Sequence, residues 1–135
     1  MNHDEKLNYG RQIRAEVLGL DHVNKPGPSR TKFQQAFQDF TEEHCWASVW
    51  TRPGLQRKTR SMLNLAMLAV LARWTEFEVH VRGALNNGVD EDEIIEIVLQ
   101  AGVYAGVPIA AEAMRAAERV INETRSKGRG TATKG

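Results

Sequence analysis

The stretch RKTRSMLNLAMLAVLARW, residues 57–74, decides the fold. Apolar residues at positions 62, 63, 65, 66 and 68–71 are spaced as in a helix and cover nearly its whole circumference. A helix that is apolar on all sides must be buried, and in a chain of only 135 residues part of that burial is expected against another subunit. The stretch therefore predicts a central helix and a homo-oligomer.

Two further helices are expected before this stretch. The first covers residues 4–18 and ends at Gly19, and the second runs from about residue 31 to about residue 49. The second helix carries Phe33, Phe37 and Phe40 at four- and three-residue spacing, a stripe that is expected to pack into a core. The proline-containing segment between the two helices is predicted to be a loop.

Helical signals also follow the central stretch. A helix over residues 75–86 is expected to stop at Asn87 and Gly88, Asp90 is expected to cap the next helix, and Pro108 to begin the last. No segment alternates between apolar and polar residues in the manner of a strand. The predicted fold class is all-α, with about six helices in a single domain over residues 1–125. Residues 126–135 are expected to form a disordered tail, because they lack large apolar side chains.

Composition limits the classes of partner and the cellular setting. The 18 basic and 17 acidic side chains leave a formal charge of +1, so neither nucleic acid nor a membrane surface is an expected partner. No apolar run reaches the roughly 18 residues that a membrane span needs, and the N-terminus lacks the apolar core of a signal peptide. A single cysteine, Cys45, has no disulfide partner in the chain, which favours a reducing, cytoplasmic location.

Cofactor motifs are missing from the sequence. There is no CxxC pair, no HExxH sequence and no glycine-rich phosphate loop. We therefore expect neither a metal nor an organic cofactor.

Glu76 and His80 are the candidate catalytic pair. They lie four residues apart on an expected helix, where Cβ atoms are roughly 5 to 6 Å apart, so the carboxylate can orient the imidazole. Such a pair can act as an acid/base unit. The alternative at these positions is an ordinary exposed pair on a helix surface.

Four other residues are candidates for substrate binding, each with a structural alternative. Arg52 and Arg60 suit a bidentate grip on a small carboxylate, but either can equally be a solvated or ion-paired surface residue. Trp50 can wall an apolar pocket or pack in a core. Tyr104 lies between small residues in GVYAGVP, where its hydroxyl can approach a pocket or close a hydrogen bond in the core.

The order of these motifs resembles the carboxymuconolactone decarboxylase family. The resemblance is carried by G-x-x-x-R-x-x-V-L-G-x-x-H-V (10–23), W-x-x-x-W-x-R-P-G-L (46–55), R-x-x-R-S (57–61), E-x-x-x-H-V-x-x-A-L-N-N-G (76–88) and Y-A-G-V-P (104–108). It extends from about Gly10 to Ala117. Each motif alone is unspecific, and the strength of the resemblance lies in their ordered occurrence.

The resemblance implies a fold, a reaction and a set of roles. The fold is an alkylhydroperoxidase D-like helical bundle, assembled as a hexamer. The reaction is loss of carbon dioxide from 4-carboxymuconolactone to give 3-oxoadipate enol-lactone in bacterial protocatechuate breakdown, the β-ketoadipate pathway, without metal or organic cofactor. His80 is expected to be the acid that protonates the intermediate, and Glu76 to fix its tautomer. The remaining roles are carboxylate binding (Arg60 and Arg52), shaping of the pocket (Trp50 and Tyr104) and a contribution from the first loop (His22).

Two other functional classes remain alternatives from sequence. Related enzymes are thiol peroxidases that work through a CxxC pair. A peroxidase of that kind would depend on Cys45 here. A non-catalytic helical oligomer or small-ligand binder would keep the apolar helices but have no need for Glu76 beside His80.

Overall fold

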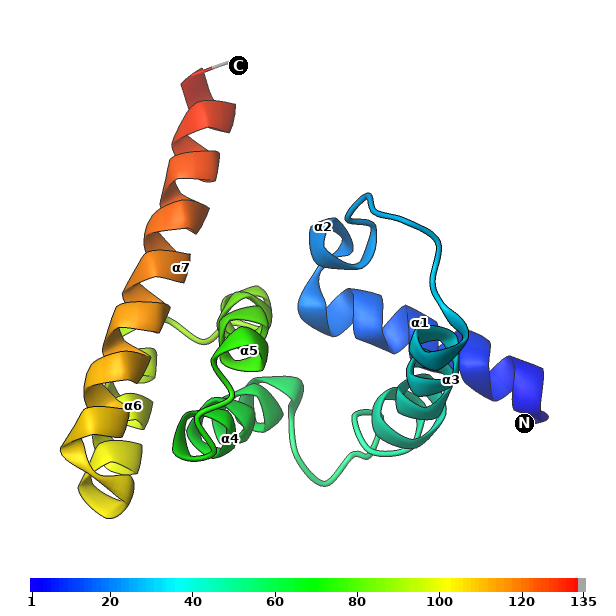
Figure 1. Ribbon diagram of the computed structural model, residues 1–135, viewed down its shortest axis with the longest axis horizontal. Coiled ribbons are helices and arrows are strands. Elements are labelled where there is room, and N and C mark those ends of the chain that lie inside the picture. The colour runs from blue at the N-terminus through cyan, green and yellow to red at the C-terminus, as the bar shows by residue number, and fades with distance from the viewer. Residues whose placement is uncertain (134–135) are drawn as a thin grey trace. The chain divides into compact units, whose positions relative to one another are not determined.

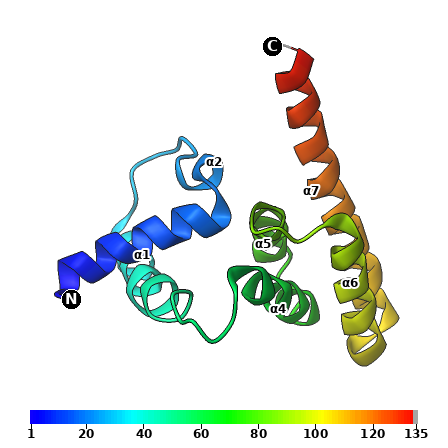
Figure 2. The same ribbon diagram turned by 180° about the vertical axis from the view of Figure 1, so that it is seen from behind.

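The computed structural model describes residues 1–133 and divides into two compact units, Met1–Arg57 and a second unit that begins at Lys58. The described residues contain seven α-helices, one π-helix and no strand, which confirms the all-α prediction (Figures 1 and 2). The elements are α1 (His3–Leu18), α2 (Leu20–Val23), α3 (Lys32–Thr41), the π-helix η1 (Glu42–Ala47), α4 (Arg57–Val70), α5 (Trp74–Asn86), α6 (Glu91–Ala105) and α7 (Val107–Thr133).

The first unit is built on a close contact between α1 and η1. A Cβ atom added to Gly10 of α1 would lie 1.9 Å from the backbone oxygen of Glu42, so no larger residue fits at this crossing. The Glu42 carboxylate is fully buried and accepts hydrogen bonds from Arg11 Nη2 and from Gln38 Nε2, both at 3.3 Å. These bonds satisfy a charge that would otherwise be costly to bury.

Three expectations for the first unit are wrong. The segment expected to be a loop contains the short helix α2, and the second expected helix changes at Glu42 from α to π geometry. The aromatic stripe is not in the core, because Phe33, Phe37 and Phe40 are 89%, 66% and 60% exposed. The spacing of apolar residues predicts that a helix has an apolar face, but it does not determine what covers that face.

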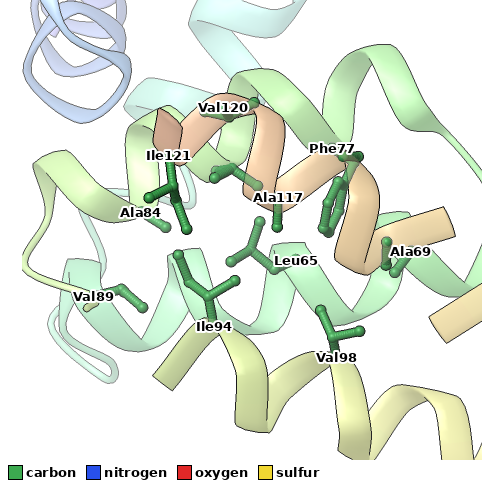
Figure 3. Packing of buried hydrophobic residues seen from close by; sticks show 13 residues of the cluster. Leu65, Ala69, Phe77, Ala84, Val89, Ile94, Val98, Ala117, Val120 and Ile121 are labelled. Atoms are coloured by element: carbon green, nitrogen blue, oxygen red, sulfur yellow. The ribbon is translucent and has the colours of Figure 1, made fainter. Parts of the chain in front are cut away.

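The second unit has a continuous apolar core shared by its four helices. Leu65 of α4, Phe77 of α5 and Val120 of α7 are completely buried and converge with Ile94 of α6, as Figure 3 shows. Helix α6 lies along α7 (Figures 1 and 2), and α5 packs on α7 as well. A core of this kind holds α4 and α5 in a fixed relation to each other.

Helix ends in the second unit follow the sequence signals. Asp90 caps α6 in a capping box with Glu93, in which each side chain accepts a hydrogen bond from the other residue's backbone N–H. The chain leaves α5 through Gly88, which has a φ of 93° that favours glycine. The boundaries predicted for α5 and α6 are therefore confirmed to within one or two residues.

The central helix is buried on one side only. Leu65 and Ala69 of α4 are buried, whereas Leu63, Met67 and Leu71 are 48%, 53% and 65% exposed. Burial within the chain thus leaves a large apolar surface on α4. The prediction that another subunit covers part of this helix stays a prediction.

Several expectations concern the chain as a whole. Helix α7 continues to Thr133, so residues 126–133, which were expected to be a disordered tail, are helical, and residues 134–135 lie outside the described part of the chain. The expectation of a single domain over residues 1–125 stays a prediction. Within residues 1–133, none of the helices is at once long enough and apolar enough to cross a bilayer.

Candidate functional site

A side-chain contact between helices α4 and α5 brings His80 and Asn64 together. Asn64 Nδ2 of α4 lies 3.5 Å from His80 Nδ1 of α5, and both side chains are partly buried. Near the other end of α5, Asn87 Nδ2 donates a hydrogen bond of 3.0 Å to the buried Oγ of Ser61. Two side-chain contacts therefore fix the register between the helix that carries His80 and its neighbour.

Arg60 is the cation on the same face of α4. It precedes Asn64 by one helical turn, and residues at this spacing lie on one side of a helix. The side chain is partly buried, and its Nε atom has almost no contact with solvent. A guanidinium and a carboxamide thus share one face of α4, and the carboxamide contacts the imidazole of α5.

Glu76 lies one turn before His80 in the first turn of α5, as predicted. Its side chain is exposed, whereas His80 is partly buried. Negative charge in the first turn of a helix is favoured by the helix dipole. The pairing of Glu76 with His80 in catalysis stays a prediction.

The other predicted residue of the second unit is Tyr104, at the end of α6. Tyr104 is 84% exposed and is flanked by Val103 and Val107, which are 82% and 78% exposed. Tyr104 therefore lies within an exposed apolar surface of the second unit. Tyr104 does not close a hydrogen bond in the core, so that alternative is wrong.

Trp50, Arg52 and His22 belong to the first unit. Trp50 is 6% exposed and its ring lies 5.2 Å from that of Trp46, so it packs within this unit. Arg52 is exposed in the turn that follows, and His22 is partly buried in α2. Their contribution to the site of His80 stays a prediction.

The environment of Cys45 is not typical of a reactive thiol. Burial raises the pKa of the Cys45 thiol, and a hydrogen bond from the Trp50 side chain opposes that shift without cancelling it. The thiolate is the nucleophile in cysteine peroxidases, and reactive cysteines have lowered pKa values. The direction of the shift disfavours the peroxidase alternative.

An apolar groove of the second unit lies between other residues of α4 and the helix α6. It has a volume of about 540 Å³ and is lined by Thr59, Met62, Leu63, Ala66, Asp90, Asp92, Glu93, Glu96, Ile97 and Gln100. The acidic rim, which includes Asp92 and Glu96, would repel a substrate with two carboxylates. We therefore place the candidate site on the face of α4 that carries Arg60 and Asn64.

Arg57, Arg60 and Asn64 follow one another at three- and four-residue spacing, which is typical of one face of a helix, but Asn64 was not among the predicted site residues. The structure separates the three residues, because Arg57 Nη2 forms an ion pair of 2.9 Å with Glu16 whereas Asn64 contacts His80. The four-residue spacing from Arg60 to Asn64 was the available signal. Within residues 1–133, His, Cys, Asp and Glu side chains do not form a group of three or more that could hold a metal ion.

Comparisons with known proteins show the family of the chain. The family model described as "Carboxymuconolactone decarboxylase family" matches residues 35–119. The chain is 42% identical to 4-carboxymuconolactone decarboxylase of Acinetobacter baylyi over 123 residues, which cover 91% of this chain and 92% of that protein. It is 41% identical to nitrosuccinic acid decarboxylase npaB of Metarhizium robertsii over 126 residues, 93% of this chain and 88% of that protein. The chain belongs to the carboxymuconolactone decarboxylase family.

Proposed function

We propose that the protein is a 4-carboxymuconolactone decarboxylase, a cofactor-independent carboxy-lyase that produces 3-oxoadipate enol-lactone and carbon dioxide. The observation that carries the proposal is the 42% identity to a protein of that name along 91% of the chain. The position of His80 and Arg60 at the junction of α4 and α5 supports it, because the reaction needs a proton donor and a cation for a carboxylate.

The substrate contains its own electron sink. When the bond between the ring carbon and the departing carboxylate breaks, its electron pair moves through the ring double bond onto the lactone carbonyl and forms a dienolate. Protonation of the dienolate at a ring carbon gives the product. His80 supplies that proton, and water returns a proton to the enzyme at the end of the cycle. The site therefore acts by stabilising the dienolate and by placing the acid.

The second carboxylate of the substrate remains through the reaction and serves as a handle. Arg60 binds this group, because a partly buried guanidinium can form two parallel hydrogen bonds with a carboxylate. Arg52 contributes a further positive charge. Binding the retained carboxylate orients the departing one toward an apolar wall, where the less charged transition state is favoured over the ground state.

The remaining residues shape and support the site. Glu76 supports the His80 ring from the preceding turn of α5, since a carboxylate at this spacing can orient an imidazole. Trp50 and Tyr104 form apolar and polar parts of the pocket wall, and His22 contributes from the first unit. The 84% exposure of Tyr104 fits a side chain that is covered only in an assembly.

The functional form is a homo-oligomer, most simply a hexamer, in the cytoplasm. The apolar surface of α4 and α6 supports this proposal, since Met67, Leu71 and Val103 are each more than half exposed. Sedimentation measures the assembly directly. A stable species of 15.1 kDa at micromolar concentration would contradict it.

A second substrate deserves the same assay, because the relative named nitrosuccinic acid decarboxylase is 41% identical over 93% of the chain. Nitrosuccinic acid is also a dicarboxylic acid with an electron-withdrawing group. The nitro group would take the place of the lactone carbonyl as electron sink, and Arg60 would again bind the retained carboxylate.

The test is a comparison of both compounds with the purified protein after exhaustive chelation. We expect carbon dioxide release from 4-carboxymuconolactone at a kcat/KM at least tenfold above that for nitrosuccinic acid. A higher kcat/KM for nitrosuccinic acid would instead assign the decarboxylation of nitrosuccinic acid to this protein. Restoration of a lost activity by zinc or manganese would contradict cofactor independence.

A further inference from the structure

The contact between Asn64 and His80 determines more than the register of two helices. A neutral imidazole has one nitrogen that carries a proton and one that accepts a hydrogen bond. Asn64 Nδ2 is a donor and has no lone pair to offer, and it lies 3.5 Å from His80 Nδ1. A favourable interaction at this distance requires Nδ1 to be the accepting nitrogen.

We propose that Asn64 is a positioning residue that holds His80 as the neutral tautomer with its proton on Nε2. The proposal rests on the proposed function for the use of that proton. With Nδ1 engaged by the carboxamide, the Nε2–H group is the one that the ring presents to the substrate, and its proton is the one that His80 passes to the dienolate.

The surroundings of Asn64 make a fixed orientation possible. Asn64 is partly buried on α4, next in sequence to Leu65, whose side chain is completely buried in the core of the second unit. The helix is therefore anchored at this point, and the carboxamide is held at a defined height along α5. Ser61, one turn earlier, is tied to Asn87 by a hydrogen bond of 3.0 Å, which limits sliding of the two helices.

Substitution by aspartate separates this role from simple packing. Asn64→Asp keeps the size of the side chain but replaces the donor with a charged acceptor. The ring should then carry its neutral-state proton on Nδ1, and the pKa of His80 should rise because the imidazolium gains an anionic partner. Asn64→Leu removes the hydrogen bond without adding charge, and should lower kcat by about tenfold with little change in KM.

The experiment is nitrogen-15 NMR of protein labelled in histidine, with the His80 signals assigned by their loss in His80→Gln. We expect an Nε2-protonated ring in the wild-type protein, an Nδ1-protonated ring with a raised pKa in Asn64→Asp, and a mixture of tautomers in Asn64→Leu. Arg57→Ala is the matched control: it removes a side chain of the same helix that pairs with Glu16, and the His80 signals should stay as in the wild type.

A wild-type ring protonated on Nδ1 would overturn the proposal, and so would a tautomer and pKa that are unchanged in both Asn64 variants. The NMR result does not depend on turnover. If the tautomer behaves as expected but no carbon dioxide is released from either substrate, the proposed function fails and the role of Asn64 in setting the ring stands. If turnover is found with the other tautomer, only the role of Asn64 fails.

Discussion

Glu76 and His80 lie one turn apart on α5, but they differ in environment: the Glu76 side chain is exposed and the His80 ring is partly buried. A carboxylate in solvent is screened, so its effect on the ring is weaker than that of a buried partner. The ring nitrogen Nδ1 faces Asn64 on the neighbouring helix. The structure therefore shows a contact to His80 from the neighbouring helix, and support from Glu76 stays a prediction.

Glu76→Gln tests the carboxylate, because it keeps the shape of the side chain and removes its charge. We expect kcat to fall by about tenfold. This loss corresponds to one hydrogen bond to a charged group, whose energy is reduced here because the Glu76 carboxylate is exposed to solvent. Combined with His80→Gln, the loss should be less than the product of the two single effects, since both residues act through one ring. Glu78→Gln is the control on the same helix. Glu78 is an ion-pair partner of Arg119, and its loss should leave kcat within about twofold.

Arg60→Ala should mainly weaken substrate binding. Removing a bidentate partner of the retained carboxylate is expected to raise KM by about 10- to 100-fold with a smaller change in kcat. Arg57→Ala is the matched control, since Arg57 is the nearest arginine along the chain and forms an ion pair with Glu16 at 2.9 Å. Equal KM values for the wild type and Arg60→Ala in steady-state assays would remove Arg60 from the site.

The raised pKa of Cys45 predicts a dependence of stability on pH. The folded state disfavours the thiolate, so the contribution of Cys45 is fully present below the ordinary thiol pKa of about 8.5 and is lost as the pH rises above it. Urea unfolding should show wild-type stability falling relative to Cys45→Ser between about pH 8 and pH 10. Cys45→Ser should also retain its decarboxylase activity. Loss of all activity in this variant would revive a thiol mechanism.

The crossing of α1 and η1 predicts a strong effect of a single methyl group. Gly10→Ala places a Cβ atom 1.9 Å from the Glu42 backbone oxygen, and relief requires a backbone shift. We expect a loss of about 3 kcal/mol in the free energy of unfolding, the upper end of typical overpacking costs. Tryptophan fluorescence during urea unfolding measures this change in the free energy of unfolding. Gly27→Ala, where an added Cβ meets nothing within 4 Å, should be neutral or slightly stabilising.

Local signals in the sequence predicted much of the fold. The Asp90 capping box and the Asn87-Gly88 stop depend on interactions within a few residues of one another, and the corresponding boundaries are close to those observed. The helix predicted over residues 57–74 begins as expected but ends at Val70. The exposed position of Phe33 was not predictable, because the spacing of residues within a helix does not specify its neighbours.

The candidate site could be predicted only in part. His80 and Arg60 were identified because their side-chain chemistry fits the reaction and because their motifs resemble a family. The role of Asn64 depends on the pairing of α4 with α5 and on the register between them, since Asn64 and His80 are 16 residues apart in sequence. Register between helices is set by the packing of the core, including Leu65 and Phe77, and no local pattern reports it.

The most direct test of the central claim is the release of carbon dioxide from 4-carboxymuconolactone by the wild-type protein and by His80→Gln, prepared in the same way and checked for equal helix content. The wild type should convert the lactone with one carbon dioxide per substrate and a matching change in ultraviolet absorbance, and His80→Gln should be slower by about 10² to 10⁴-fold. No release by the folded wild type, or equal rates for the two proteins, would contradict a decarboxylase that works through His80.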